Sequence, residues 1–518
     1  MALSLVSGVH AQAVRVPVDE IVVTGNTLLA PEVLRATLAP LTGELTLDDL
    51  KQAAHKVQAL YRDAGYGAVV AYVPEQTAAS RRAIIAVLEG RIANVEVVGN
   101  SRFAKDNVLR SVPHLKTGVT PQVRRLDTEV QMANENPAKR IALTLEAGER
   151  TGEVDARLVV VEQPPTSWTF VVDSSGNDNT GLLRSSLRYQ HAALWNLDHV
   201  LSLQVGSSLK NPSDAPSIGA SYRIPMYERA TMVDIFAAYS NASGGDTPTA
   251  AGVLQFSGRG GALGLLLTHH LERADEFERQ IGIGVDVRLF LNDCTIQGLP
   301  AGACGSAGES VTSNPVVLTY LVRRGGSMPA GISLSGSWNV GLIGPYRDEA
   351  SFQAVREGAP KSYALARMSG FLILSLPAQW QLQGRISSQV AGNPLISGEQ
   401  FGIAGANSVR GYLEREVTGD QGLAASLELY APTLLNPMGV TQSMLQLLAF
   451  IDAGEVRNRR NAPCQGVRSV CQLSSVGLGL RARWQALQLR LDVANALKDG
   501  NSTLSGETRA SLLASYSF

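Results

Sequence analysis

NSVRGYLERE, residues 407–416, lies in a long polar segment between two runs in which polar and apolar residues alternate. Its centre places Arg410 directly before Gly411 and Tyr412. Fixing a long side chain in a loop costs conformational entropy, so this arrangement is expected to be ordered only if the arginine binds a partner. The fold of the surrounding segments indicates what that partner is.

Alternation of period two fills the chain after about residue 165, as in residues 380–390 and 478–493, where one face is apolar and the other carries arginines and glutamines. A sandwich would bury the apolar face, whereas an outer-membrane barrel turns it to lipid and lines its lumen with the polar face. Strands of about ten residues, tight turns such as NPMG between long Gly/Ser loops, and a final strand favour the barrel. We therefore expect a membrane β-barrel of about 16 antiparallel strands, although the aromatic content of 6% is low for one. No run of about 18 apolar residues occurs, which argues against a membrane-spanning helix.

The last strand, ASLLASYSF, ends the chain on an aromatic residue. Alternation places Leu512, Ala514, Tyr516 and Phe518 on one face. This pattern resembles the signal that is recognised when outer-membrane barrels are assembled, so the assembly machinery is an expected partner.

The first third of the sequence contains a repeat. IVVTGN at residues 21–26 is matched by VEVVGN at residues 95–100, and each is followed by helical sequence and two further strands. In the first copy, Thr46 is a good helix N-cap and Gly65 lies just past the helix end. We predict two α+β modules of order β-α-α-β-β at residues 14–90 and 91–164, a break at Gln-Pro-Pro-Thr 163–166, and the barrel at residues 165–518.

A candidate partner for Arg410 lies on the strand QSMLQLLAFIDAGEV. Asp452 has the same parity as Gln446, so it is expected to face the lumen, and Gly454 follows two residues later. Charge-assisted bidentate pairs are strong hydrogen bonds. We predict that the loop folds back into the barrel, that Gly411 permits the turn at its tip, and that Arg410 pairs with Asp452.

Three features together resemble the two-partner secretion transporters. They are the loop motif Val409-Arg410-Gly411-Tyr412, the strand motif Phe450-Ile451-Asp452-Ala453-Gly454 and the two modules. This family includes the haemolysin-activator and filamentous-haemagglutinin exporters and belongs to the superfamily of outer-membrane assembly barrels. The resemblance covers the chain from about residue 16 to Phe518.

The resemblance implies that the modules are polypeptide-transport-associated (POTRA) domains in the periplasm, which capture an unfolded exoprotein of haemolysin or adhesin type. The barrel, embedded in outer-membrane lipid, would then secrete it past the loop that carries Arg410. The sequence has no GxxxxGK[ST] loop, so transport is expected without nucleotide. Many family members carry an N-terminal plug helix. Only a short segment lies between Ala13 and Ile21, so we expect that such a helix is either absent or lost by truncation.

An exposed strand edge of a module could bind an extended cargo segment as an additional strand. The candidate edge in the second module comprises Arg140, Ile141, Leu143 and Leu145. The alternative is that these residues are simply part of the sheet.

Cys294 with Cys304, and Cys464 with Cys471, form two close pairs in loop-like sequence. Disulfides that close short loops suit an exported protein, with free thiols as the alternative. Residues 1–13 end in Ala11-Gln12-Ala13 and are interpreted as the remnant of a signal peptide, or otherwise as an N-terminal tail.

Several classes of function are disfavoured. A net charge of -1, from 45 Lys+Arg and 46 Asp+Glu, argues against nucleic-acid binding. His269-His270 with Glu272 lacks the spacing of a metal site, and no nucleophile elbow is present, so neither a metal, a cofactor nor an enzyme is expected. The main alternative is an outer-membrane protein insertase of the same superfamily, although such insertases usually have three or more modules. A passive pore would not need the modules.

Overall fold

The computed structural model describes residues 15–77, 81–176, 181–210, 212–213, 216–249, 252–274, 276–291, 309–435 and 443–518. The chain forms two compact units, the first ending at Glu162 and the second running from Gln163 to Phe518 together with residues 136–138. The predicted signal remnant at residues 1–13 and the predicted pair Cys294 and Cys304 lie outside the described residues. We keep 14–90, 91–164 and 165–518 as proposed domain boundaries.

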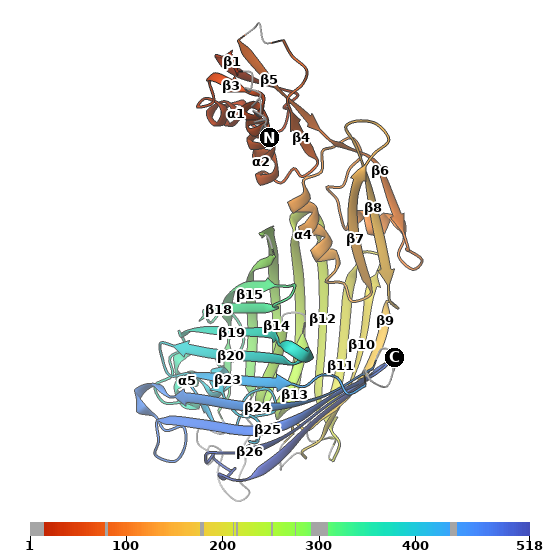
Figure 1. Cartoon of the computed structure of the whole chain (residues 1–518). Coiled ribbons are helices and arrows are strands. Elements are labelled where there is room, and N and C mark those ends of the chain that lie inside the picture. Colours follow the sequence, from red (N-terminus) through yellow and green to blue (C-terminus); the bar gives the residue numbers. More distant parts are fainter. Residues whose placement is uncertain are drawn as a thin grey trace, which may run out of the picture. The chain divides into compact units, whose positions relative to one another are not determined.

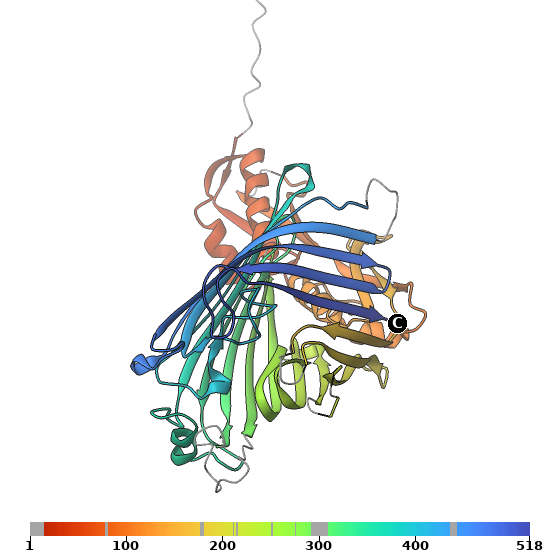
Figure 2. The ribbon, with the colours of Figure 1, turned by 90° about the horizontal axis from the view of Figure 1, so that it is seen from below.

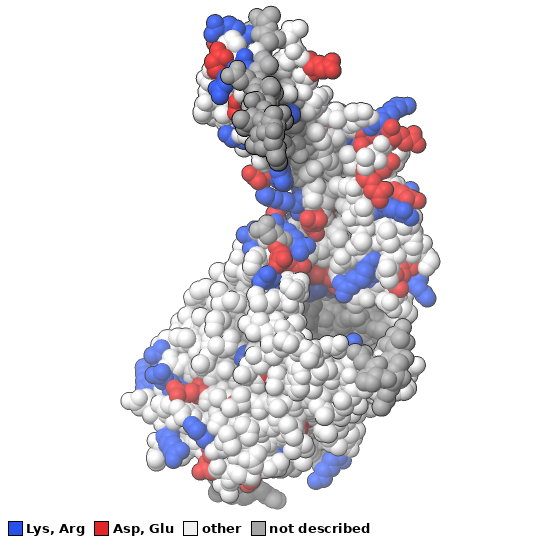
Figure 3. Space-filling view, in the orientation of Figure 1, with Lys and Arg blue, Asp and Glu red and all other residues white. Residues whose placement is uncertain are grey.

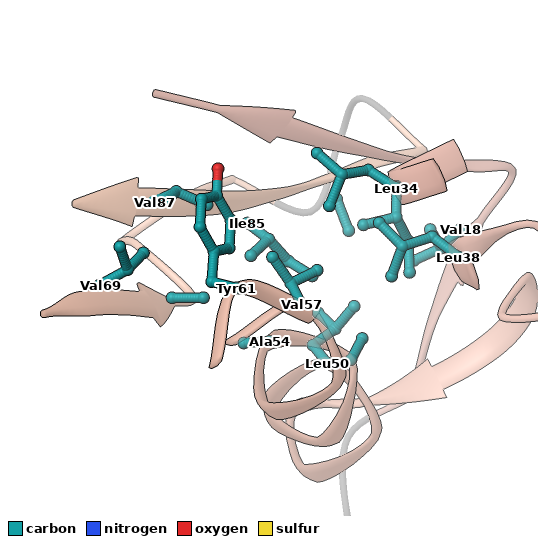
Figure 4. Close-up of a cluster of buried hydrophobic side chains, with 14 residues drawn as sticks. Val18, Leu34, Leu38, Leu50, Ala54, Val57, Tyr61, Val69, Ile85 and Val87 are labelled. Atoms are coloured by element: carbon teal, nitrogen blue, oxygen red, sulfur yellow. The ribbon is translucent and has the colours of Figure 1, made fainter. Parts of the chain in front are cut away.

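The first module begins with strand β1 (Arg15–Val18), which pairs with β3 (Gly43–Thr46). Its main sheet has the order β2 (Glu20–Thr24), β5 (Arg82–Glu89), β4 (Val69–Tyr72), and it is covered by α1 (Pro31–Leu38) and α2 (Leu47–Asp63). Thr46 and Asp49 form a capping box at the start of α2. Figure 4 shows the core between this helix and the sheet, where Val57, Tyr61 and Ile85 are fully buried.

The second module repeats this plan. Its sheet has the order β6 (Arg91–Val98), β8 (Glu153–Glu162), β7 (Lys139–Ala147), with helices α3 (Lys105–Arg110) and α4 (Val123–Ala133). In the three-stranded sheet of each module, the strand that comes first in the sequence and the strand that comes last are parallel neighbours. The strand that precedes the last one therefore lies at the edge of each sheet.

The repeated Gly-Asn sequence has a structural cause. Gly25 and Gly99 have φ values of +79° and +83°, and a Cβ atom on either would meet a backbone carbonyl of the last strand within 2.4 Å. The turn that follows is bound by the glutamate that ends the last strand, Glu89 or Glu162. Glu162 accepts hydrogen bonds from the N–H groups of residues 101, 102 and 103 at 3.0, 2.7 and 3.0 Å. Burial raises the pKa of Glu162, but these hydrogen bonds outweigh burial and lower its pKa overall.

The second unit is a closed antiparallel barrel (Figures 1 and 2). In the described part of the chain its wall has sixteen strands, because β16 and β17 are two pieces of one strand interrupted at Asn314. The strands are β9 (Thr166–Asp173), β10 (Arg184–Leu194), β11 (His199–Ser208), β12 (Ser217–Met226), β13 (Thr231–Thr249), β14 (Gly252–Ala274), β15 (Phe277–Leu291), β16 (Val311–Ser313), β17 (Pro315–Arg324), β18 (Ala330–Asn339), β19 (Ala364–Ser375), β20 (Gln381–Ala391), β23 (Gln421–Tyr430), β24 (Ser443–Arg457), β25 (Val470–Trp484), β26 (Leu487–Ala496) and β27 (Thr508–Ser517). The barrel closes where β27 pairs with β9. The predicted fold, a barrel of about sixteen strands after two α+β modules, is confirmed.

Most connections at the end where β9 begins are short turns, and most connections at the other end are long loops. Four of the five tryptophans, Trp168, Trp195, Trp380 and Trp484, lie exposed at the short-turn end. On the face shown in Figure 3, the barrel wall carries few charged side chains. An apolar exterior with an aromatic girdle is typical of a barrel in lipid. No helix among the described residues is long and apolar enough to cross a membrane.

Candidate functional site

Three positions on the inner face of β24 form the floor of the site: Phe450, Asp452 and Gly454. Phe450 and Asp452 are buried, and alternation along the strand turns all three the same way. A Cβ atom on Gly454 would lie 3.1 Å from Ile403 and 3.2 Å from Val409. The motif therefore combines an aromatic ring, a carboxylate and a gap that accommodates part of the loop between β20 and β23, residues 392–420, which we call the lumen loop.

Arg410, in the lumen loop, occupies this floor and is 1% exposed. Its Nε and Nη2 donate to the two carboxylate oxygens of Asp452 at 2.7 Å each, and its backbone N–H donates to Asp452 at 3.1 Å. The guanidinium carbon lies 3.4 Å from the centre of the Phe450 ring. A bidentate pair combined with cation–π stacking holds the arginine in one orientation.

Two further carboxylates face the same guanidinium. Arg410 Nη1 lies 2.7 Å from Glu428 and 3.5 Å from Asp492, as ion pairs without hydrogen-bond geometry. Glu428 also pairs with Arg385, and Asp492 pairs with Arg481 and Arg490. Sequence reasoning identified Asp452 but missed Glu428 and Asp492, whose only sequence signal is their inward parity.

The residues around Arg410 fix the tip of the lumen loop. Gly411 has a φ of +93°, and its Cα approaches Ala494 so closely that an added Cβ would be 3.2 Å away. Val409 is fully buried in a cluster with Ile403, and Tyr412 packs in the same cluster. The Tyr412 hydroxyl lies 2.9 Å from the carbonyl oxygen of Ser474 and 2.8 Å from that of Lys498.

A second attachment joins the lumen loop to the hairpin between β26 and β27, residues 497–507. The carboxylate of Glu416 accepts hydrogen bonds from the N–H groups of Ser502 and Thr503 at 2.6 and 2.7 Å. Its other oxygen accepts one from the Thr503 hydroxyl at 2.7 Å. The tip is thus bound to the wall and to an adjacent loop at the same end.

A third attachment lies at the base of the lumen loop. Glu399, 1% exposed, pairs with Arg288 at 2.9 Å and with Arg367 at 3.2 Å. Asp420, at the other end of the loop, pairs with Arg356 at 3.0 Å and accepts the backbone N–H of Arg459 at 2.7 Å. None of these residues was identified from sequence, because parity gives the face of a strand but not the neighbours across the lumen.

The lumen is not filled by the loop. A cavity of about 550 Å³ remains between the lumen loop and the inner faces of the opposite strands, and its lining includes Ser333, Ser335 and Arg367. Its lining is mixed in polarity and carries charges from Asp286, Arg288 and Glu414. A space of mixed polarity whose lining carries charges suits passage of a hydrated chain better than capture of an apolar ligand.

Cys464 and Cys471 form a disulfide that closes the hairpin between β24 and β25. Cys471 belongs to the same buried cluster as Val409 and Tyr412. The disulfide therefore supports the part of the wall on which the loop tip rests.

The predicted cargo edge coincides with β7, which is an edge strand of the second module. Ile141 is buried and Arg140 is exposed, while Leu143 and Leu145 follow on the same face as Ile141. The outer edge at Ile141 is occupied by a side chain: Asn134 accepts its N–H at 2.6 Å and donates to its carbonyl oxygen at 3.0 Å. Alternation then turns the backbone groups of Leu143 and Leu145 to the same outer edge.

The C-terminal strand has the predicted face. Tyr516 and Phe518 are exposed with their rings 5.8 Å apart, and Tyr516 pairs in register with Phe170 of β9. By the register with β26, Leu512 and Ala514 share that outer face. The role of this face in assembly remains a prediction.

These features define a class of protein: a lipid-embedded barrel with N-terminal α+β modules and an arginine that holds a loop inside the lumen. The described residues contain no group of three His, Cys, Asp or Glu side chains able to hold a metal. The arrangement holds a segment of the chain inside the lumen through buried ion pairs.

The comparison with known proteins narrows this class. The family model for haemolysin secretion/activation proteins of the ShlB/FhaC/HecB type matches residues 324–482, and the ShlB-type POTRA model matches residues 16–90. These two matches identify residues 324–482 and the first module as parts of a two-partner secretion transporter, a family that lies in the outer membrane with its POTRA domains in the periplasm.

Individual proteins are similar to this chain in sequence or in fold. The chain is 24% identical over 460 residues to the heme/hemopexin transporter HuxB of Haemophilus influenzae, covering 84% of this chain and 75% of HuxB. CdiB of Escherichia coli has a similar fold, with a TM-score of 0.82 and 17% identity, over 100% of this chain and 93% of CdiB. CdiB of Acinetobacter baumannii gives a TM-score of 0.74 at 18% identity, over 98% of this chain and 91% of that protein.

Proposed function

We propose that this transporter captures an unfolded exoprotein in the periplasm and secretes it through its lumen, without nucleotide and without catalysing a reaction. The observation that carries the proposal is Arg410, buried on three carboxylates at the tip of a loop inside the barrel. A loop held by ion pairs in a polar lumen can be displaced by a polypeptide, because water and polar groups can replace each contact as the loop leaves.

We place capture at the edge strand β7. A cargo segment added beside Leu143 and Leu145 would gain backbone hydrogen bonds without demanding a particular cargo sequence. Asn134 already supplies both hydrogen bonds at Ile141, so it limits how far a strand can extend along this edge. Capture therefore begins at Leu143, and extension to Ile141 requires Asn134 to move away.

Secretion would follow the cavity between the lumen loop and the opposite wall. About 550 Å³ is enough for a few residues of extended chain but too small for a folded domain, which requires the cargo to be unfolded during passage. Folding of the cargo outside the cell would then make the movement one-way.

For the cargo we propose a β-rich exoprotein of haemolysin or adhesin type. The relative HuxB is named a heme/hemopexin transporter, so a cargo that serves heme acquisition is one member of this class to test. We further propose that the face formed by Leu512, Ala514, Tyr516 and Phe518 delivers the barrel to the assembly machinery.

The experiment is to co-produce a candidate exoprotein of haemolysin or adhesin type with the wild type, Arg410→Asp, Asp452→Arg and the double swap. Exported cargo is quantified, and heat-shifted mobility on gels shows that each barrel has assembled. We expect both single changes to stop export and the swap to restore part of it. If the wild type exports nothing and its loss leaves other outer-membrane barrels unassembled, the chain is an insertase and the proposal is wrong.

A further inference from the structure

An apolar segment follows β18 at the long-loop end of the barrel. In residues 340–346, which we call the rim segment, Val340, Leu342, Ile343 and Tyr346 are between 48% and 57% exposed. Exposed apolar side chains that are scattered singly need no explanation, but four within seven residues form a patch. Helix α5 (Glu349–Val355) follows it, with Phe352 buried in a separate cluster.

The backbone of the rim segment is fixed. Val340 N–H donates to the Asn314 carbonyl oxygen at 3.1 Å, and Ile343 N–H donates to the Asn314 side chain at 3.0 Å. Thr312 N–H donates to the carbonyl oxygen of Tyr346 at 3.0 Å, and the guanidinium of Arg347 binds the carbonyl oxygen of Leu342. The backbone of the segment is therefore held against the top of the wall, while its apolar side chains stay about half exposed.

The rim segment continues a row of outward-facing residues. Ile332, Leu334 and Trp338 are exposed along the outer face of β18, and Val340 has the same parity just past the strand end. From Ala330 to Trp338 the chain rises by about 21 Å, at about 3.4 Å per residue and a tilt of about 40°. The apolar band of an outer-membrane barrel is about 25 Å tall, so Trp338 lies close to its outer boundary and the rim segment lies at or just beyond it.

We propose that the rim segment docks into the outer leaflet, with Leu342, Ile343 and Tyr346 in the acyl-chain boundary beneath the lipid headgroups. Three observations favour lipid over a protein partner. The patch is continuous with the lipid-facing wall, it lies at the height of the boundary, and it is preceded by Trp338, a residue type that concentrates at such boundaries. Arg347 directly follows the patch. Its guanidinium binds backbone carbonyl oxygens through Nη1, and its other N–H groups are placed to bind headgroup phosphates.

The test measures lipid contact directly. Ile343→Cys is labelled with bimane, and the purified full chain is placed in nanodiscs of phosphatidylcholine that contain the same lipid with a doxyl quencher either near the headgroup or near the end of the acyl chain. Leu318→Cys, on the outer face of β17, is the lipid-facing control. Val467→Cys, which is 99% exposed in the hairpin between β24 and β25, is the water-exposed control, and the unsubstituted chain gives the labelling blank.

We expect bimane at position 343 to be quenched several-fold more than at position 467, and more by the shallow quencher than by the deep one. Quenching at position 343 no stronger than at position 467 would overturn the proposal. Loss of export in Ile343→Asp without any quenching of the label would instead assign the patch to a protein partner. The quenching results do not depend on whether the proposed cargo pathway is correct; the export readout of Ile343→Asp rests on the proposed function.

Discussion

Replacing Asp452 by Asn removes the charge that binds the loop tip but keeps nearly the same size and shape of side chain at this position. Asp452 is fully buried, and among the described residues its ion pair is with Arg410. Glu428 and Asp492, in contrast, keep other arginines as partners. In Asp452→Asn, the guanidinium of Arg410 retains two carboxylates, at 2.7 and 3.5 Å, but loses its bidentate partner.

The magnitude follows from this geometry. Breaking a buried ion pair typically costs about 3–5 kcal/mol, and the two remaining carboxylates place Asp452→Asn near about 3 kcal/mol. Arg410→Met should cost more, at about 4–5 kcal/mol, because it leaves Asp452 buried without an ionic partner. Since about 1.4 kcal/mol is tenfold in an equilibrium, opening of the loop tip should rise about 100-fold in Asp452→Asn and further in Arg410→Met.

Hydrogen–deuterium exchange of the purified barrel measures this opening. Backbone amides of residues 403–417 should lose protection in the order Arg410→Met, then Asp452→Asn, then Glu428→Gln. Glu455→Gln is the matched control, because this carboxylate of the same strand binds Gln472 rather than the lumen loop. Unchanged protection at residues 409–412 in an assembled Asp452→Asn barrel would refute the reasoning.

Three other predictions concern separate parts of the molecule. The pKa of Glu162 is lowered in the folded module, so the stability that its carboxylate contributes is present above the unfolded pKa of about 4.3 and is lost as the pH falls below that pKa. Amide protection at residues 101–103 should therefore drop in acid, and Glu162→Gln should remove that pH dependence. Changing Cys464 and Cys471 together to Ser should raise amide exchange in residues 458–470, because a disulfide with a sequence separation of 7 contributes about 2.5 kcal/mol to stability in the loop-entropy model. No rise in exchange would show that the hairpin is held by packing alone. Asn134→Ala should expose the edge at Ile141 and strengthen binding of an extended cargo peptide in fluorescence anisotropy, whereas weaker binding would show that Asn134 is part of the site.

The two-module and barrel architecture was predictable because it depends on periodicity within short segments. The repeat at Gly25 and Gly99 marks turns that require positive φ, and the parity of Phe450, Asp452 and Gly454 follows from strand geometry alone. The partners Glu428 and Asp492 were not predictable in this way. They reach Arg410 only through the register of four neighbouring strands, which depends on turn geometry and packing rather than on local pattern.

Other features escaped sequence reasoning for the same reason. Glu162 binds a turn some sixty residues earlier in the chain, and Asn134 covers the edge of β7 from the end of a helix. Glu399 attaches the base of the lumen loop to Arg288 of β15 and Arg367 of β19. Asp420 attaches it to Arg356, which directly follows α5 in an outer loop. Most of these contacts join polar side chains or backbone groups that are far apart in the sequence. Neither hydropathy nor residue spacing identifies which polar or charged residues will contact each other in the folded chain.

The measurement that tests secretion through the lumen most directly is photo-crosslinking to a stalled cargo. The exoprotein is fused to a domain that folds in the periplasm and halts transit, and a photoreactive phenylalanine analogue replaces either Ser335 or Leu334. Ser335 lines the cavity beside the lumen loop, whereas Leu334, its neighbour on β18, faces lipid. The account predicts crosslinks to cargo from position 335 and none from position 334; crosslinks from position 334 alone, or from neither position while export proceeds, would contradict it.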